Sequence, residues 1–422
     1  MLPIALSKRQ IAIVGVLVVV VVGFFVLLRI GSKPGGSAGQ IKLAFWGAES
    51  KKDFEGLLGA YKQFRPNVEI TYTELPTGDL NEKLLTALAE GKGPDMVTIG
   101  SRDVDSLFTL LAPANTNQFS LAQFQAAFPT VAEQDFVRGG NAYAVPLFID
   151  TLALFYNKDA FDQAGITAPP TTWGEFQELV LKLRRDSRAG AAIGGSEQSV
   201  RYAADLLELL IMQNGGRMTD ASAGRAVFAR EEKGIQAFQF YLQFSNAGSP
   251  LYTWNDAEEE SIESFASGKS AMAFGYHGNI AEIKGRSPFL SFGVAAMPQV
   301  DMNRPIAHAS YSGLAALKQG KNPQWAWDFM MFAAANAKGS AAYLDTTKRP
   351  PGFREAIAKA QNDASLGVFA RQALIARSWQ VPDDGKMKTI LNDAVKNVLT
   401  GKLGSETALR QAEDQTTQLL GK

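Results

Sequence analysis

The hydrophobic pattern between Ile41 and Ile99 changes period repeatedly, and this alternation limits the fold more than any other feature of the chain. Stretches in which every second residue is apolar predict strands, and stretches with apolar residues at helical spacing predict helices. The predicted order is strand 41–46, helix 54–64, strand 68–73, helix 80–88 and strand 96–99. Such an order predicts a parallel, doubly wound α/β sheet.

The ends of the predicted strands indicate where a ligand would bind. In open α/β sheets, ligands bind beyond the carboxyl ends of the strands. Trp46 and Glu49 follow the first predicted strand, and Arg102 follows the third. These three residues are therefore candidates for one binding site.

A second α/β unit begins near Asp150. Thr172 and Glu175 have the spacing of a capping box, which predicts the start of a helix. Further elements are predicted as a strand over 152–156, helices over 203–212 and 235–244, a strand over 271–274 and a helical tail from 353 onward.

The N-terminus carries an uncharged apolar run from Ile11 to Leu28. A membrane-spanning helix needs about 17–25 such residues, whereas the apolar region of a cleaved signal peptide has about 7–15. Arg29 follows the run directly, and the nearest small-residue cleavage site is Gly36-Ser37-Ala38. We therefore expect an uncleaved membrane anchor. Because basic residues flank both ends of the run, the charge distribution does not fix its orientation.

The composition excludes several classes of function. Lys plus Arg and Asp plus Glu are equal in number, at 42 each, so no basic surface for nucleic acid is expected. The chain has no cysteine, which excludes disulfides and thiolate metal sites. With only two histidines, most hydrolytic triads and many transition-metal sites are disfavoured. We expect no cofactor and no metal.

Two local motifs are disfavoured as phosphate or cation sites. Gly268-Lys269-Ser270 would end a phosphate-binding P-loop, but the position that requires the first glycine holds Glu263. The acidic run 256–260 fits a helix start, where carboxylates offset the positive end of the helix dipole, better than a cation site.

Aromatic residues near predicted element ends have two possible roles. Trp46, Trp254 and Trp379 can either pack in a core or form a platform for a ligand. Tyr276 and His277 stand between two glycines just after a predicted strand, which is typical of a pocket wall.

Five segments together resemble the extracellular solute-binding proteins of the maltose-binding type. The resemblance covers the chain from about Ile41 to Leu420. The segments are LLTALAEGKGPDMV (84–97), AVPLFIDTLALFYNKDAF (144–161), GITAPPTTWGEF (165–176), FASGKSAMAF (265–274) and PQWAWDFMMF (323–332). They occur in the order found in that family.

The resemblance implies a two-lobed periplasmic-binding-protein-like (type II) clamp, preceded here by the transmembrane helix. The expected divisions are an anchor (1–30), a flexible linker (31–40), an N-lobe (41–149 and 314–348) and a C-lobe (150–313 and 349–422). The family places its ligand in the cleft between the lobes.

The resemblance also implies roles for individual residues. Asp150 falls where the family has a cleft carboxylate at the first crossover between lobes. Tyr276, His277 and Trp379 fall near its aromatic platforms. The complete set of candidate ligand-binding residues is Trp46, Glu49, Arg102, Asp150, Tyr276, His277 and Trp379.

The function implied is binding, not catalysis. We expect a monomeric solute-binding protein on the extracytoplasmic side of the cell membrane, which delivers a mono- or oligosaccharide to the permease subunits of an ABC transporter. A tethered receptor that senses without transport is an alternative. A glycoside hydrolase is a further alternative, and would need two carboxylates such as Glu49 and Asp150 facing each other across the cleft. We expect neither the lipid-modified Cys nor the cleaved signal that is usual in the family.

Overall fold

The computed structural model describes residues 40–421 except 77, 221 and 223, and Lys42–Lys422 form one compact unit. The predicted anchor and nearly all of the predicted linker lie outside the described residues. Within the described part of the chain, no helix is both long and apolar enough to cross a bilayer.

The first lobe is built on a six-stranded sheet with the order β2-β1-β3-β13-β4, in which β7 also pairs with β13. Its strands are β1 (Ile41–Gly47), β2 (Val68–Glu74), β3 (Met96–Gly100), β4 (Leu111–Ala112), β7 (Ala144–Pro146) and β13 (Ser312–Leu317). β1 and β3 are parallel, as predicted. β13 runs antiparallel to β3, with Gly313 opposite Ile99.

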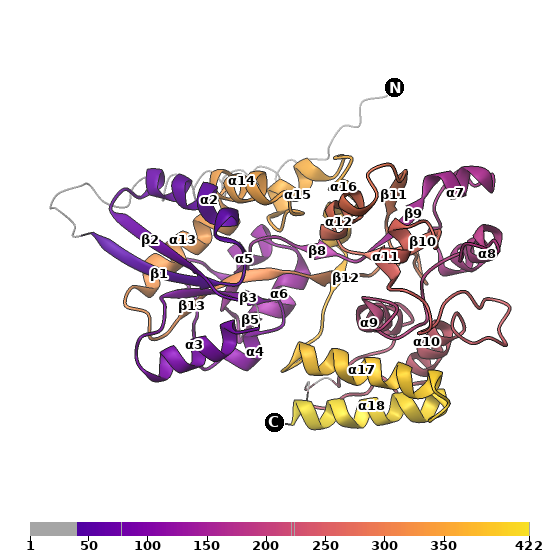
Figure 1. Cartoon of the computed structure of the whole chain (residues 1–422). Helices are drawn as coiled ribbons and strands as arrows, with labels where there is room; N and C mark the ends of the chain where they lie inside the picture. The colour runs from indigo at the N-terminus through magenta and orange to yellow at the C-terminus, as the bar shows by residue number, and fades with distance from the viewer. Residues whose placement is uncertain (1–39, 77, 221, 223, 422) are drawn as a thin grey trace, which may run out of the picture. The chain divides into compact units, whose positions relative to one another are not determined.

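Helices cover both faces of this sheet. The helices are α2 (Lys51–Phe64), α3 (Leu80–Ala89), α4 (Val104–Leu107), α5 (Leu121–Ala127), α6 (Thr130–Phe136), α13 (Pro323–Ala335) and α14 (Ala337–Thr347), and a short hairpin joins β5 (Val137–Arg138) to β6 (Asn141–Ala142). α2 and α14 pack together on one face, and α3 and α4 lie toward the other (Figure 1). Phe45 of β1 fixes the first of these layers, because its ring packs edge-on against Phe54 of α2 at 4.9 Å.

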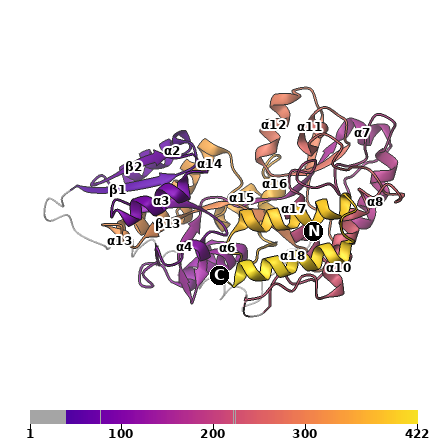
Figure 2. The same cartoon turned by 60° about the horizontal axis from the view of Figure 1, so that its bottom comes forward.

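The second lobe contains the antiparallel sheet β10-β9-β11 and most of the remaining helices. Its elements are β9 (Ala153–Asn157), α7 (Lys158–Gln163), α8 (Trp173–Leu183), α9 (Ala203–Gln213), α10 (Glu232–Leu242), α11 (Ser261–Ala266), β10 (Met272–Gly275), α12 (Gly278–Arg286), β11 (Phe292–Ala295), α17 (Asp384–Leu399) and α18 (Ser405–Leu420). α17 and α18 lie side by side (Figure 2).

Two local predictions in the second lobe are confirmed. Thr172 and Glu175 form the capping box of α8: the Thr172 hydroxyl accepts from the Glu175 N–H, and the Glu175 carboxylate accepts from the Thr172 N–H. The acidic run before residue 261 is a helix start, because the Glu260 carboxylate caps α11 by accepting from the Ile262 and Glu263 N–H groups.

A small sheet with the order β14-β12-β8 joins the lobes. It consists of β8 (Asp150–Thr151), β12 (Ala307–Ser310) and β14 (Ala376–Arg377), and two helices lie nearby, α15 (Arg354–Ala360) and α16 (Gly367–Ala373). Ser310 of β12 stands opposite Asp150, and His308 stands opposite Arg377. Only Tyr311 separates β12 from β13 of the first lobe. The chain therefore passes between the lobes along paired strands.

Candidate functional site

Arg102 reaches from the first lobe to the second. It follows β3, and its side chain is 5% exposed. Its Nη1 donates to Glu208 Oε1 at 3.1 Å and to Asp384 Oδ1 at 2.9 Å, and its Nη2 donates to Glu208 Oε2 at 2.5 Å. Glu208 lies on α9 and Asp384 begins α17, so one guanidinium binds two elements of the other lobe.

The same contacts continue through the crossover sheet. His308 of β12 places Nε2 3.0 Å from Arg102 Nη2, and its Nδ1 lies 2.9 Å from the Tyr276 hydroxyl. Tyr276 donates to Asp205 Oδ2 at 2.8 Å. Lys388 ends the chain of contacts, with Nζ 3.2 Å from both an Asp205 and an Asp384 oxygen. We call this set the interlobe network: Arg102, Asp205, Glu208, Tyr276, His308, Asp384 and Lys388.

Opposite charges within the interlobe network stabilise the charged forms of their partners. Burial alone would raise the pKa of the Glu208 carboxyl, but the Arg102 charge and the hydrogen bonds from His308 and Arg102 hold it well below its ordinary value. Burial would lower the pKa of Lys388, but the Asp205 and Asp384 carboxylates raise it above its ordinary value. Beside His308, the network contains two cations, Arg102 and Lys388, and three carboxylates, those of Asp205, Glu208 and Asp384.

A cavity of about 160 Å³ adjoins the interlobe network. Side chains that line it include Ser101, Arg102, His308, Ser310, Asp384 and Lys388. These residues come from the end of β3, from β12 and from α17, so the cavity lies where the two lobes and a crossover strand meet. Polar groups from both lobes could thus contact one small ligand there.

Asp150 and His277 form a second group at the crossover. The Asp150 carboxylate accepts from the His277 N–H at 3.0 Å and from the Thr151 N–H at 2.8 Å. Burial raises the pKa of Asp150 to about 7, and these hydrogen bonds and the Arg349 charge only partly oppose it. The His277 ring lies edge-on to Phe369 at 5.3 Å. Asp150 therefore holds the backbone segment that carries the predicted aromatic platform.

The sequence profile of the bacterial extracellular solute-binding proteins matches residues 47–339, which is more than half of the chain. The chain belongs to this family. The family consists of solute-binding proteins, so the prediction of a binding protein and not an enzyme is confirmed.

Individual relatives of this solute-binding protein are distant but span nearly its whole length. A putative binding protein of Brucella abortus is 22% identical, covering 94% of this chain and 96% of its own. The sn-glycerol-3-phosphate-binding periplasmic protein of Salmonella typhimurium is 24% identical, covering 90% and 92%. The structure of the sugar-binding protein MalE from Xanthomonas citri aligns with a TM-score of 0.77 at 21% identity, covering 90% and 97%. The expected two-lobed fold is thereby confirmed.

The predicted site residues fall into separate groups in this solute-binding protein. Arg102 and Tyr276 lie in the interlobe network, and the Trp379 ring centroid is 5.8 Å from the Arg102 guanidinium carbon. Asp150 and His277 contact each other through the backbone of His277. Trp254 packs in the second-lobe core, and its indole N–H donates to the Ser199 carbonyl.

Trp46 and Glu49 stand at the end of β1, and no hydrogen bond or ring contact joins them to either group among the described residues. The Glu49 backbone carbonyl accepts from the Tyr72 hydroxyl at 2.6 Å. Its side-chain Oε2 is buried and has no hydrogen-bond partner in the described part of the chain, and the same is true of Trp379 Nε1. Buried polar atoms without a partner are uncommon, and a ligand or water is one explanation.

Sequence reasoning found Tyr276 but missed the four charged second-lobe members of the interlobe network, Asp205, Glu208, Asp384 and Lys388. Asp205 and Glu208 are three residues apart in a helix that is otherwise almost entirely apolar, AADLLELLIMQ. Acidic residues are rarely buried without a partner, so two of them on one face of such a helix were a usable signal. Nothing local indicated that the partner would be Arg102.

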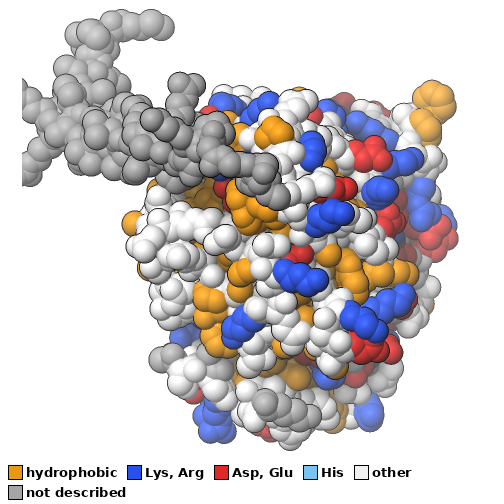
Figure 3. Space-filling view, turned by 90° about the vertical axis from the view of Figure 1, so that its left-hand side faces the viewer, with side chains coloured by type: hydrophobic (Ala, Val, Ile, Leu, Met, Phe, Trp, Pro, Cys, Tyr) orange, Lys and Arg blue, Asp and Glu red, His pale blue; other side chains and the backbone are white. Residues whose placement is uncertain are grey.

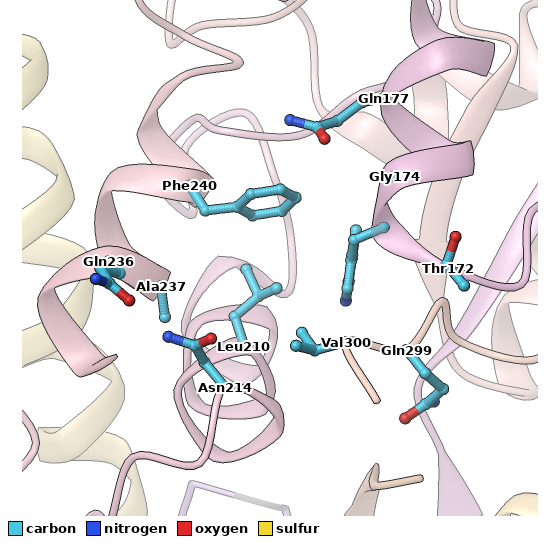
Figure 4. Close-up of a pocket in the computed structure, with 11 residues that line it drawn as sticks. Thr172, Gly174, Gln177, Leu210, Asn214, Gln236, Ala237, Phe240, Gln299 and Val300 are labelled. Carbon is cyan, nitrogen blue, oxygen red and sulfur yellow. The ribbon is translucent and has the colours of Figure 1, made fainter. Parts of the chain in front are cut away.

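A larger cavity of about 330 Å³ lies within the second lobe (Figure 4). Phe240, Leu210 and Val300 provide apolar walls, and Gln177, Asn214, Gln236 and Gln299 provide amides around it. All its lining residues come from one lobe, so a ligand there could not bridge the two. The interlobe site is therefore the better candidate for a clamp.

Proposed function

We propose that this chain captures a small neutral polar ligand, a mono- or oligosaccharide, between its lobes and delivers it to the permease subunits of an ABC transporter. The observation that carries the proposal is the convergence of Arg102 from one lobe with Glu208 and Asp384 from the other. A ligand that contacts both lobes favours the closed state by its differential affinity for that state. Family membership supports the binding role.

The charge of the site supports a neutral ligand over an anionic one. The terminal N–H groups of Arg102 already bind the Glu208 and Asp384 carboxylates, and the interlobe network holds three carboxylates against one arginine and one lysine. Both positive and negative side chains appear on the first-lobe face shown in Figure 3.

Several chain features suit a saccharide. Aromatic rings cover the C–H faces of sugars, and charged side chains bind their hydroxyls. We propose that the rings of Trp46, His277 and Trp379 cover the C–H faces of the sugar. Glu49 and Asp150 would bind its hydroxyls, and Arg102 and Tyr276 would form the cleft wall. Solved structures of the same fold include proteins bound to α-D-tagatose, from Thermotoga lettingae, and to maltotetraose.

The proposal is tested by a thermal-shift screen of residues 40–422 against mono- and oligosaccharides, polyols, polyamines and glycerol phosphates. A ligand at 100 times its Kd should stabilise the fold by about 2.7 kcal/mol. We expect a saccharide to do so, and calorimetry should then show weaker binding in Trp46→Ala and Trp379→Ala. Stabilisation by a polyamine or a phosphate ester alone would contradict the sugar assignment.

We further propose that residues 1–30 anchor a monomer in the cell membrane, with 31–40 as linker and the lobes divided at about 149/150, 313/314 and 348/349 on the extracytoplasmic side. The anchor would raise the local concentration of the protein near its permease. A tethered receptor without transport remains the alternative, and co-purification with permease subunits distinguishes the two.

Mass analysis of the N-terminus of protein isolated from cell membranes tests the anchor. We expect an intact segment 11–28. A mature chain that begins near Gly39 would contradict the anchor while leaving the binding role untouched.

A further inference from the structure

We propose that Glu208 and Asp384 are specificity-determining residues: they act as built-in counter-ions that occupy Arg102 and so exclude anionic ligands from the interlobe site. The inference rests on the proposed capture of a neutral ligand between the lobes, and names the residues that enforce neutrality.

The terminal nitrogens of Arg102 already have hydrogen-bond partners within the protein. A guanidinium has four N–H groups on its two terminal nitrogens. Each terminal nitrogen of Arg102 makes two contacts: Nη1 with Glu208 and Asp384, and Nη2 with Glu208 and His308. Carboxylates therefore engage three of the four terminal N–H groups, and the fourth faces the His308 ring, so a phosphate or carboxylate ligand cannot use the paired geometry by which arginine normally binds such groups.

An anionic ligand would have to displace the Glu208 carboxylate from Arg102, and this displacement costs free energy. Its side chain is 1% exposed and stands on α9 between the buried Leu207 and Leu209. An anion that displaced it would leave a carboxylate buried without its partner, which is strongly unfavourable. Asp384 differs, because its side chain is 33% exposed and can turn toward water. Glu208 is thus the main barrier, and Asp384 the weaker one.

Without the Glu208 and Asp384 charges, the interlobe site would favour an anion. Arg102 and Lys388 both line the 160 Å³ cavity, together with the side chains of Ser101 and Ser310. A water molecule occupies about 30 Å³ in the liquid, so the cavity has room for several water molecules or a small anion. With Glu208 and Asp384 neutral, Arg102 and Lys388 would outnumber the remaining network carboxylate, Asp205.

The test is calorimetric titration of wild type and Glu208→Gln/Asp384→Asn with inorganic phosphate and sn-glycerol 3-phosphate, at low ionic strength, with glycerol as the neutral probe. We expect the double variant to bind the phosphates at least about tenfold more tightly than wild type, because two carboxylate charges that oppose an anion near 4 Å have been removed. Glycerol should show no comparable gain. Adding Arg102→Met to the double variant should abolish the gain.

Glu413→Gln is the matched control. Glu413 is also a buried carboxylate that pairs with an arginine, Arg230, but it lies on α18 away from the interlobe network. It should leave phosphate affinity unchanged. If the double variant does not fold, Asp384→Asn alone carries the test, because its side chain is partly exposed, with a smaller expected gain.

A folded variant with unchanged phosphate affinity overturns the inference, as does an equal gain in Glu413→Gln. If wild type also binds a saccharide, the proposed function survives that result. Wild type that binds sn-glycerol 3-phosphate, and loses it on Arg102→Met, would overturn both the inference and the neutral-ligand assignment.

Discussion

Arg102→Met should lower the free energy of unfolding by about 3–5 kcal/mol, as expected for removal of one partner from a buried ion pair. The methionine side chain fills much of the space but leaves Glu208 buried without a cation. The measurement is chemical denaturation at neutral pH. Arg65→Met is the control, because the Arg65–Asp328 pair lies within the first lobe and both side chains are at least 20% exposed. It should cost about 1 kcal/mol or less.

A second substitution separates the ion pair from simple packing. Glu208→Leu in the Arg102→Met background removes the stranded charge, and replacing both partners of a buried pair by apolar groups is often neutral. The double variant should therefore be more stable than Arg102→Met alone. Strict additivity of the two single changes would mean that Arg102 and Glu208 do not interact energetically.

Asp150→Asn should change the pH dependence of stability. The folded-state pKa of Asp150 is about 7, against an ordinary value of 3.8, because the carboxyl is buried. Between these pH values the folded state binds a proton that the unfolded state has lost, so the free energy of unfolding falls as pH rises. The asparagine variant lacks this loss, while its amide oxygen can still accept from the His277 N–H.

We expect the stability of Asp150→Asn relative to wild type to increase by about 1.4 kcal/mol per pH unit between pH 4 and 7, and by about 4 kcal/mol in total. Urea denaturation at several pH values measures it. The buried Asp135, whose pKa is raised to about 6 by burial, contributes equally to both proteins and cancels in the difference. Asp186→Asn, at an exposed position, should show no such trend. A stability difference that stays constant with pH would contradict an elevated pKa at Asp150.

Local patterns were sufficient for the first five elements of the first lobe and for several second-lobe elements. The period changes between 41 and 89 predicted β1, α2, β2 and α3, because each of these elements has one buried face that repeats at its own spacing. β3 was predicted as a short buried strand after the Gly-Pro break, and it is buried almost throughout. β13 was not predicted: SGLAAL has no alternation, since the strand is buried almost throughout. Its place beside β3 depends on a partner more than 200 residues earlier in the chain.

The candidate site was less predictable for the same reason. Arg102 and Tyr276 were found from their positions after strands, but their partners lie on α9, β12 and α17, and no local pattern links them. The position of a residue directly after a strand indicates at which edge of the sheet that residue lies. It does not reveal that a residue such as Arg102 already has its hydrogen bonds satisfied within the protein.

The paired crossover strands have a mechanical consequence. β13 pairs with β7 on one side of the junction and β12 pairs with β8 on the other, while the Leu147 N–H donates to the Ser312 carbonyl between them. A two-stranded ribbon flexes out of its plane with little change in its ladder, whereas sliding one strand along the other breaks every rung. The pairing therefore opposes sliding of the strands past each other more than it opposes bending at the junction. The register of the paired strands therefore helps to align Arg102 of the first lobe with Glu208 and Asp384 of the second.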